Sequence, residues 1–291
     1  MDKFLHKAVN WVVKNLTFFD PSSEIVGESI EIRLKAFIEL VYMYSILPED
    51  QFFQGHNKLI VEQFLSETIS CNNLHHAALF SKSTLGAVSV LNEYAQDSNT
   101  TKILNSYVQH NFDIIAKRVP YRKLDVKRSL ENIGIHSNLA PYNEIYEGTI
   151  LYKDFNCLLT NDDISYSLTH TVFYLTNTGK LEYSFSDIDR VKSLILSLLV
   201  FYTLKGNLDI LGELLMSLYF LRINLSISDK LIVDTAFRAL TSGQNSSGFV
   251  RGPYSTDKDD VQGRFYNNYH TTLVSLGAYY AITELNKGGA H

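Results

Sequence analysis

Long stretches of this sequence place apolar residues at helical spacing, and few prolines interrupt them. Proline ends or kinks a helix because it lacks the backbone N–H and clashes with the preceding turn, and the chain has only five prolines in 291 residues. At the start of the chain, Phe4, Ala8 and Val12 recur at steps of four residues, which places them on one face of a helix. These features predict an all-α protein.

Most of the predicted helices are about 12 to 18 residues long, which is ordinary for a helical domain. They cover residues 3–16, 29–47, 56–69, 74–95, 100–118, 164–176, 188–204, 208–221, 228–241 and 269–280. Gly179, Gly206 and Asn207 stand where helices should end, and we expect left-handed caps there. Residues 119–152 contain Pro120, Gly134 and Pro141, and we interpret this segment as a long ordered excursion packed over one end.

No low-complexity linker divides the chain, so we expect a single α-helical domain over residues 1–291. Helices recur in pairs joined by loops along the whole sequence. Such hairpins can close on themselves as an α/α toroid or stack as an open α-solenoid. Both arrangements accommodate a domain of this size.

Composition excludes several classes of function. The net charge of −5 argues against a nucleic-acid or anionic-membrane partner, because both favour clustered Lys and Arg. The N-terminal residues lack an apolar core of the signal-peptide type, and no segment is apolar enough to span a membrane. Cys71 and Cys157 stand alone, which argues against a disulfide framework and fits a reducing cytoplasm. We find no phosphate-binding glycine loop and no nucleophilic serine elbow.

The predicted helix over residues 164–176 has two unlike faces. Leu168 and Val172 belong to an aliphatic side, while Tyr166, His170 and Tyr174 gather on the opposite side. A face of His and Tyr suits a cavity with a few polar groups. The alternative is that His170 is a structural residue that bonds a neighbouring carbonyl.

Asp209 and Glu213 lie four residues apart on the predicted helix over residues 208–221. Paired carboxylates repel unless they are solvated, bound to a cation or sharing a proton. They belong either to a solvated outer face or to an inner face, where they would meet His170 and His270. Two imidazoles and a carboxylate can act as an acid/base set or bind Zn²⁺ or Fe²⁺. A metal would take His170, His270 and Glu213, although the chain has no short metal-ligand motif.

A basic and aromatic group stands just before the excursion, where Arg118, Tyr121 and Arg122 lie close in sequence. Two guanidinium groups near a cavity mouth could bind a carboxylate or phosphate of a substrate. The alternative is that they form salt bridges with the acidic surface.

The segment over residues 240–284 combines Gln244-Asn245-Ser246-Ser247-Gly248-Phe249 with an apolar helix that opens on Tyr269-His270-Thr271-Thr272-Leu273. It resembles one repeat of the α-toroid superfamily that includes squalene cyclases and protein prenyltransferases. In such a repeat a glutamine can bond exposed helix-end groups while the glycine permits the turn. The resemblance implies an α/α toroid with Tyr269 and His270 at the mouth of an inner helix. Residues 257–260 spell the Asp-x-Asp-Asp motif of the cyclases, but we interpret them as a solvated loop because they stand well before that helix.

Most of the chain also resembles an uncharacterised bacterial family known as a domain of unknown function, often encoded beside peptide natural-product genes. The matching stretches are Trp11 with Phe19-Asp20-Pro21, and residues 118–122, 168–174, 209–215 and 269–272. One departure is Asn177-Thr178-Gly179, where the family pattern has Asp-Phe-Gly. The resemblance implies a shared fold and a shared site but brings no activity with it.

Two functions are favoured for a cytoplasmic protein of this kind, while a third, a purely structural helical scaffold, is disfavoured by the faces of His and Tyr but stays open. The first is a tailoring enzyme that acts on a peptide or other natural product, with His170, Asp209, Glu213, His270 and Tyr174 as catalytic residues and Arg118, Tyr121, Arg122 and Tyr269 as substrate-binding residues. The second is a non-catalytic module that binds a peptide or protein partner in the same pathway. The sequence leaves the reaction, the substrate, a bound metal and the oligomeric state undetermined.

Overall fold

The computed structural model describes residues 3–22, 29–48, 52–70, 74–79, 84–153 and 156–288. Within these ranges the protein is all-α and has no strand, apart from an isolated antiparallel bridge between Gln244 and Val250. The all-α prediction is thus confirmed for this part of the chain. Cys71 lies outside the described residues. No helix in the described ranges has both the length and the apolar character that crossing a membrane requires.

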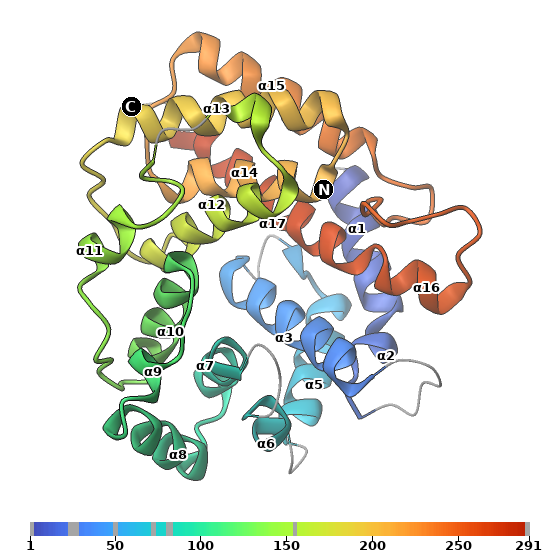
Figure 1. The fold of residues 1–291 in the computed structure, drawn as a ribbon. Helices are drawn as coiled ribbons and strands as arrows, with labels where there is room; N and C mark the ends of the chain where they lie inside the picture. The colour runs from blue at the N-terminus through green and yellow to red at the C-terminus, as the bar shows by residue number, and fades with distance from the viewer. Residues whose placement is uncertain are drawn as a thin grey trace.

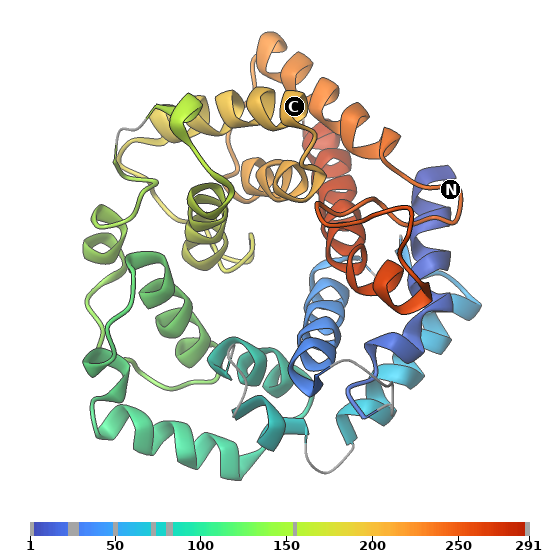
Figure 2. The same ribbon diagram turned by 45° about the vertical axis from the view of Figure 1, so that its right-hand side comes forward.

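Six helices form a connected series of contacts. They are α3 (Ile30–Ile46), α7 (Thr84–Tyr94), α10 (Pro120–Asn132), α12 (Asp162–Leu175), α14 (Leu208–Phe220) and α17 (Tyr269–Gly288). Each helix packs against the next, and α17 packs against α3. The series therefore returns to its starting point, as the arrangement in Figure 2 shows.

The remaining helices are not part of this series, and most of them lie around it in space (Figure 1). They are α1 (Lys3–Lys14), α2 (Leu16–Phe19), α5 (His56–Ser70), α6 (Leu74–Leu79), α8 (Ser98–Gln109), α9 (Phe112–Ile115), α11 (Tyr142–Glu147), the 3-10 turn η1 (Cys157–Leu159), α13 (Ile188–Lys205), α15 (Ile227–Ser242) and α16 (Val261–Tyr266). Among them, α1 and α15 pack on α17, and α13 packs on α14. Helices α14 and α17 of the series are thus covered by helices that do not belong to it.

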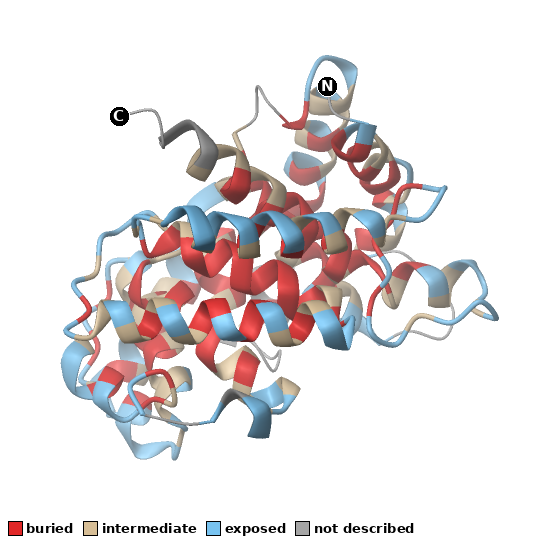
Figure 3. Cartoon of the chain, turned by 90° about the horizontal axis from the view of Figure 1, so that it is seen from above, coloured by how far each residue is buried: buried red, intermediate tan, exposed pale blue. Residues whose placement is uncertain are grey.

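Helix α14 is buried on nearly every side, and Figure 3 shows that buried residues gather on helices in the middle of the molecule. Asp209 and Glu213 are only 3% and 2% exposed, which excludes the solvated outer face considered above. Close packing against α17 depends on Gly212, because a Cβ atom at this position would stand 2.6 Å from Val274 Cγ1. Both carboxylates are therefore held within the protein by a tightly packed helix pair.

Several helix boundaries follow from local capping. The side chains of Ser29, Asn161 and Asn207 accept hydrogen bonds from the first backbone N–H groups of α3, α12 and α14, which otherwise have no partner within the helix. Gly206 ends α13 with φ +77°, and Gly179 has φ +82°. The two glycines are thus left-handed as expected, but the prediction was wrong for Asn207, which has φ −83° and caps the start of α14 instead.

Other boundaries differ from the predicted ones. The segment over residues 119–152, interpreted above as an excursion, begins with the regular helix α10, which packs between α7 and α12. Helix α10 begins at Pro120. Proline is favourable at the first position of a helix, because the backbone N–H that it lacks would have no partner within the helix there. The predicted helix over residues 100–118 is divided into α8 and α9 at Asn111, which has a left-handed backbone with φ 60°.

The loop after α15 is hydrogen-bonded to α1, which lies near the start of the sequence. Gln244 Nε2 donates to the carbonyl oxygens of Phe4 at 2.9 Å and Gly248 at 3.0 Å. Gly248 has φ +111°, and a Cβ atom there would stand 2.3 Å from the Lys7 carbonyl oxygen. The glutamine and glycine therefore act as the sequence predicted, one by bonding a helix carbonyl and the other by permitting a tight turn.

Candidate functional site

Four helices of the six-helix series contribute to a cluster of ionisable side chains. Glu39 comes from α3, His170 from α12, Asp209 and Glu213 from α14, and His270 from α17. We call these five residues the histidine–carboxylate cluster. The sequence predicted four of them, and the structure brings those four together.

Glu213 lies between the two imidazoles. Its Oε2 atom is 3.6 Å from His170 Nδ1, and its Oε1 atom is 3.8 Å from His270 Nε2. Thr169 Oγ1 donates a hydrogen bond to Oε2 at 2.5 Å. Burial raises the pKa of Glu213, but His170 and His270 outweigh this effect and lower the pKa below its usual value. The carboxyl group is therefore ionised at neutral pH although it is buried.

His270 is surrounded by carboxylates. Its Nδ1 atom is 2.8 Å from Glu39 Oε2, and its Nε2 atom is 3.6 Å from Asp209 Oδ2. Burial lowers the pKa of the imidazole, but the charges of Asp209 and Glu39 and the contact with Glu213 raise it well above 6.5. The ring is thus positively charged at neutral pH. A third of its side-chain surface is still accessible to solvent.

Glu39 completes the cluster and was not predicted from the sequence. Burial raises the pKa of its carboxyl group, but His270 and Lys35 outweigh this and lower the pKa to about 2. Burial and the charge of Glu39 raise the pKa of Tyr269 well above its usual value, so its hydroxyl stays protonated near this carboxylate. The Tyr269 ring is only 4% exposed and stacks on Phe265 at 5.4 Å, so it presents little surface to a substrate.

Both oxygens of Asp209 accept hydrogen bonds from hydroxyl groups. Tyr166 donates to Oδ2, and Thr271 Oγ1 donates to Oδ1 at 2.9 Å. Burial and the charge of Asp209 raise the pKa of Tyr166, which keeps its hydroxyl protonated as a donor. Thr169 and Thr271 adjoin the two histidines in sequence. That adjacency is the signal by which these hydroxyl donors could have been found.

His170 is anchored through one nitrogen only. Its Nδ1 atom donates to the Tyr166 carbonyl oxygen at 2.8 Å, because a carbonyl can only accept. A neutral ring therefore carries its lone pair on Nε2, and within the described part of the chain no hydrogen bond reaches that atom. The bond to the carbonyl is the structural role considered above, and it leaves the second nitrogen available for chemistry.

Four aromatic rings surround His170, and 29% of its side-chain surface is accessible. The centroids of Phe173, Tyr174, Tyr166 and Tyr121 lie 5.7, 5.9, 6.3 and 6.4 Å from that of the imidazole. Burial and the charge of Asp125 raise the pKa of Tyr174 well above its usual value, so its hydroxyl stays protonated. Tyr174 is therefore close to His170, as predicted, and Tyr121 lies near the same ring.

The two arginines that were predicted to bind a substrate have different neighbours. Arg122 pairs with Asp125 at 3.2 Å and lies 5.1 Å from the Tyr121 ring centroid, so it is near the aromatic surroundings of His170. Arg118 donates to the Tyr107 hydroxyl at 2.7 Å and to the Asp113 carbonyl at 3.0 Å. These contacts tie Arg118 to α8 and α9, and it makes none with the cluster.

The cluster as arranged does not fit a metal ion. Within the described ranges, no group of three or more His, Cys, Asp and Glu side chains is disposed to hold one. The predicted ligands His170 and His270 face different oxygens of Glu213, and the nitrogen by which His170 faces it already donates to a carbonyl. Nitrogen ligands must offer a lone pair to the metal, so His170 cannot bind a metal beside Glu213 through Nδ1.

The acidic loop over residues 257–260 has a structural role. Asp260 caps α16 by accepting a hydrogen bond from the Gly263 N–H at 2.7 Å, and Asp259 accepts one from Asn267 at 2.9 Å. Asp257 is exposed. The loop is thus a solvated cap, as expected, and it contributes nothing to the histidine–carboxylate cluster.

The described chain is an all-α protein with a histidine–carboxylate cluster whose Asp209 and Glu213 are buried. It belongs to the family described as a domain of unknown function, DUF6895, which matches residues 5–280. No curated protein and no solved structure matches the chain. The family match covers every residue of the cluster.

Proposed function

We propose that this protein is an acid/base enzyme built on an α/α toroid. The closed series of contacts through α3, α7, α10, α12, α14 and α17 supports the toroid, because an open α-solenoid would leave its first and last inner helices apart. In this arrangement the inner helices are the six that form the series, and four of them carry the histidine–carboxylate cluster.

The observation that carries the enzymatic proposal is the position of Glu213 between two unlike imidazoles. His270 is held as a cation by Glu39 and Asp209, whereas His170 presents an unbonded Nε2. A cation stabilises negative charge that develops in a transition state, and a free imidazole nitrogen accepts a proton. Glu213 lies close to both rings. Loss of a proton from one ring therefore changes how strongly the other ring holds its own proton.

The roles follow from these surroundings. His170 Nε2 is the general base, His270 is the general acid or electrostatic stabiliser, and Glu213 positions both. Tyr121 and Tyr174 provide aromatic surface beside His170 on which an apolar or planar part of the substrate can pack. Arg122 lies near these rings and can pair with a substrate carboxylate.

The substrate class we propose is a peptide or other natural product that the protein tailors in the cytoplasm. The partly accessible rings of Tyr121, Tyr166 and Tyr174 beside His170 support a substrate with aromatic or apolar parts. The family resemblance supports a place beside peptide natural-product biosynthesis. A neutral or weakly charged reacting group fits best, because buried carboxylates already balance the charge of His270.

Metabolite comparison of strains that carry the wild-type gene, a deletion, Glu213→Gln or His170→Gln tests this proposal. We expect both variants to lose the product that the deletion loses, because removing a general base or its partner lowers rates by roughly 10²- to 10⁴-fold. Glu144→Gln is the matched control, since Glu144 is exposed. Purified variants should keep wild-type helicity by circular dichroism.

The alternative is a peptide- or partner-binding module without chemistry. The aromatic surroundings of His170 favour it, because rings of this kind also bind ligands without reacting. In the same experiment, a product that is lost on deletion but retained by both Glu213→Gln and His170→Gln would support the binding module and overturn the enzyme.

A further inference from the structure

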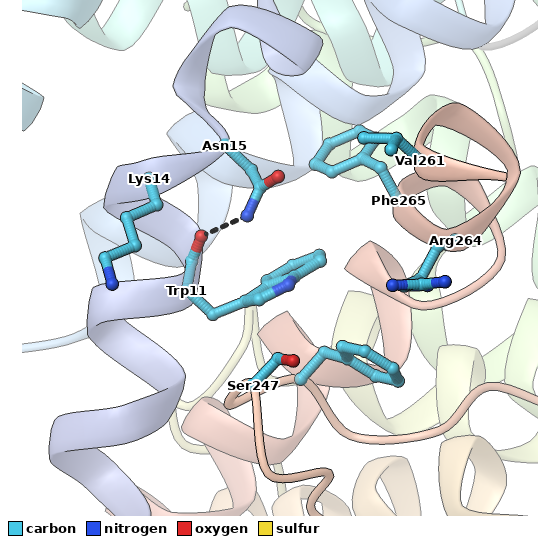
Figure 4. A pocket seen from close by; sticks show the side chains of 8 residues that line it. Trp11, Lys14, Asn15, Ser247, Val261, Arg264 and Phe265 are labelled. Carbon is cyan, nitrogen blue, oxygen red and sulfur yellow. Dashed lines mark hydrogen bonds between the residues drawn. The ribbon is translucent and has the colours of Figure 1, made fainter.

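A pocket of about 370 Å³ lies between α1 and the segment that contains α16 (Figure 4). None of its lining residues belongs to the histidine–carboxylate cluster. The volume is within the range of small-molecule sites, roughly 300 to 1,000 Å³. The pocket is therefore a second candidate site, and its chemistry can be read independently of the first.

Aromatic side chains form one side of this pocket. Trp11 stacks on Phe265 at a centroid distance of 5.7 Å and an interplanar angle of 18°, and it contacts Phe249 at 5.8 Å. The three rings are nine-tenths or more buried, so packing fixes their orientation. A rigid group of rings of this kind suits a flat ligand that stacks against the indole.

The charge of the pocket is positive. Its two charged lining residues are Lys14 and Arg264, and no acidic side chain lines it, although the whole chain carries a net charge of −5. Figure 4 shows the Arg264 guanidinium facing the indole of Trp11, while the Lys14 ammonium extends along the side of α1. Arg264 is thus placed to contact a ligand on the indole, and Lys14 adds charge at the rim.

Most of the hydrogen-bonding capacity of Arg264 is unused. Its Nη2 atom donates to the Asp259 carbonyl oxygen at 3.3 Å, and the described residues accept no other hydrogen bond from this guanidinium. A guanidinium has five N–H donors in a planar fork that matches a carboxylate. Arg264 is exposed, so its remaining donors are open to a ligand that displaces water, and a planar anion satisfies both the fork and the rings.

We propose that this pocket binds a small aromatic carboxylate. The ring of the ligand lies against Trp11, and its carboxylate pairs with Arg264. No group in the pocket suits proton transfer, so the ligand is bound without being changed. This proposal does not depend on the enzymatic role of the histidine–carboxylate cluster.

Tryptophan fluorescence provides a direct test, because Trp11 is the only tryptophan of the chain. Benzoate and benzamide serve as probes that share ring and size and differ in charge. We expect benzoate to change the emission saturably and benzamide to bind roughly tenfold more weakly, as expected when a charge-assisted bond is lost. Equal affinity for the two probes, or no saturable change with benzoate, would overturn the proposal.

Substitutions of the charged lining residues test whether benzoate binds in this pocket. Arg264→Gln should weaken benzoate binding roughly tenfold, and Lys14→Gln by about two- to threefold, because Lys14 acts only through its charge. Lys102→Gln is the matched control, since Lys102 is an exposed cation on α8. Circular dichroism verifies that each variant is folded. Wild-type affinity in folded Arg264→Gln would contradict the assignment of the site.

Discussion

His270 Nδ1 lies 2.8 Å from Glu39 Oε2, although 231 positions separate the two residues in the sequence. The contact joins the first helix of the inner series, α3, to the last, α17. It also sets the charge of the cluster, because Glu39 and Asp209 hold His270 as a cation. A single ion pair therefore contributes to closing the fold and to defining the candidate site.

Removing the imidazole should destabilise the protein. His270→Gln leaves Glu39, Asp209 and Glu213 without their shared cation, and breaking a buried ion pair costs about 3 to 5 kcal/mol. Because a third of the ring is accessible, we expect a loss of about 2 to 3 kcal/mol in the free energy of unfolding in urea. His136→Gln, at an exposed histidine, should stay within about 0.5 kcal/mol of wild type. Equal effects of the two substitutions would show that the ion pair contributes nothing.

The ion pair between His270 and Glu39 also predicts how the stability of the protein depends on pH. The folded pKa of His270 is raised well above 6.5, so its stabilisation is complete below pH 6.5 and is lost as the pH rises through the folded pKa. The pKa of Glu39 is lowered from 4.5 to about 2, so its stabilisation is complete above pH 4.5 and is lost as the pH falls towards 2. The difference in unfolding free energy between wild type and His270→Gln should therefore be largest from pH 4.5 to 6.5. A difference that does not vary with pH would contradict the ion pair.

The tautomer of His170 can be observed directly. Because Nδ1 donates to the Tyr166 carbonyl oxygen, the neutral ring should carry its proton on Nδ1 and leave Nε2 unprotonated. Nitrogen-15 NMR of histidine-labelled protein distinguishes the two tautomers by their shifts, and His170→Gln assigns the signal. A neutral His170 with its proton on Nε2 would remove this residue as the base.

The turn after α15 should depend on Gly248. An alanine there must adopt φ +111°, and its Cβ would stand 2.3 Å from the Lys7 carbonyl oxygen. We expect Gly248→Ala to lower the free energy of unfolding by at least about 3 kcal/mol. The matched control is Gly134→Ala, which shares a positive φ but meets nothing within 4 Å and should cost only about 1 to 2 kcal/mol. Equal losses would show that contact with α1 is unimportant.

The amino-acid sequence by itself determined the helices and two of their polar faces. Helical period and capping are local properties, so the positions of α12 and α14, the face with His170 and Tyr174, and the pairing of Asp209 with Glu213 could be read from neighbouring residues. The division of α8 from α9 was missed, because a non-glycine residue at a left-handed position, Asn111, leaves only a weak sequence signal.

The tertiary structure alone decided what those faces contact. Glu39 has no local signal, because its role arises only where α3 packs against α17. The burial of Glu213 and the separation of Arg118 from the cluster depend likewise on which helix covers which face. Periodicity gives the angle between side chains on one helix but not the direction in which that helix is turned towards its neighbours. Packing sets that direction, and with it the charge of His270.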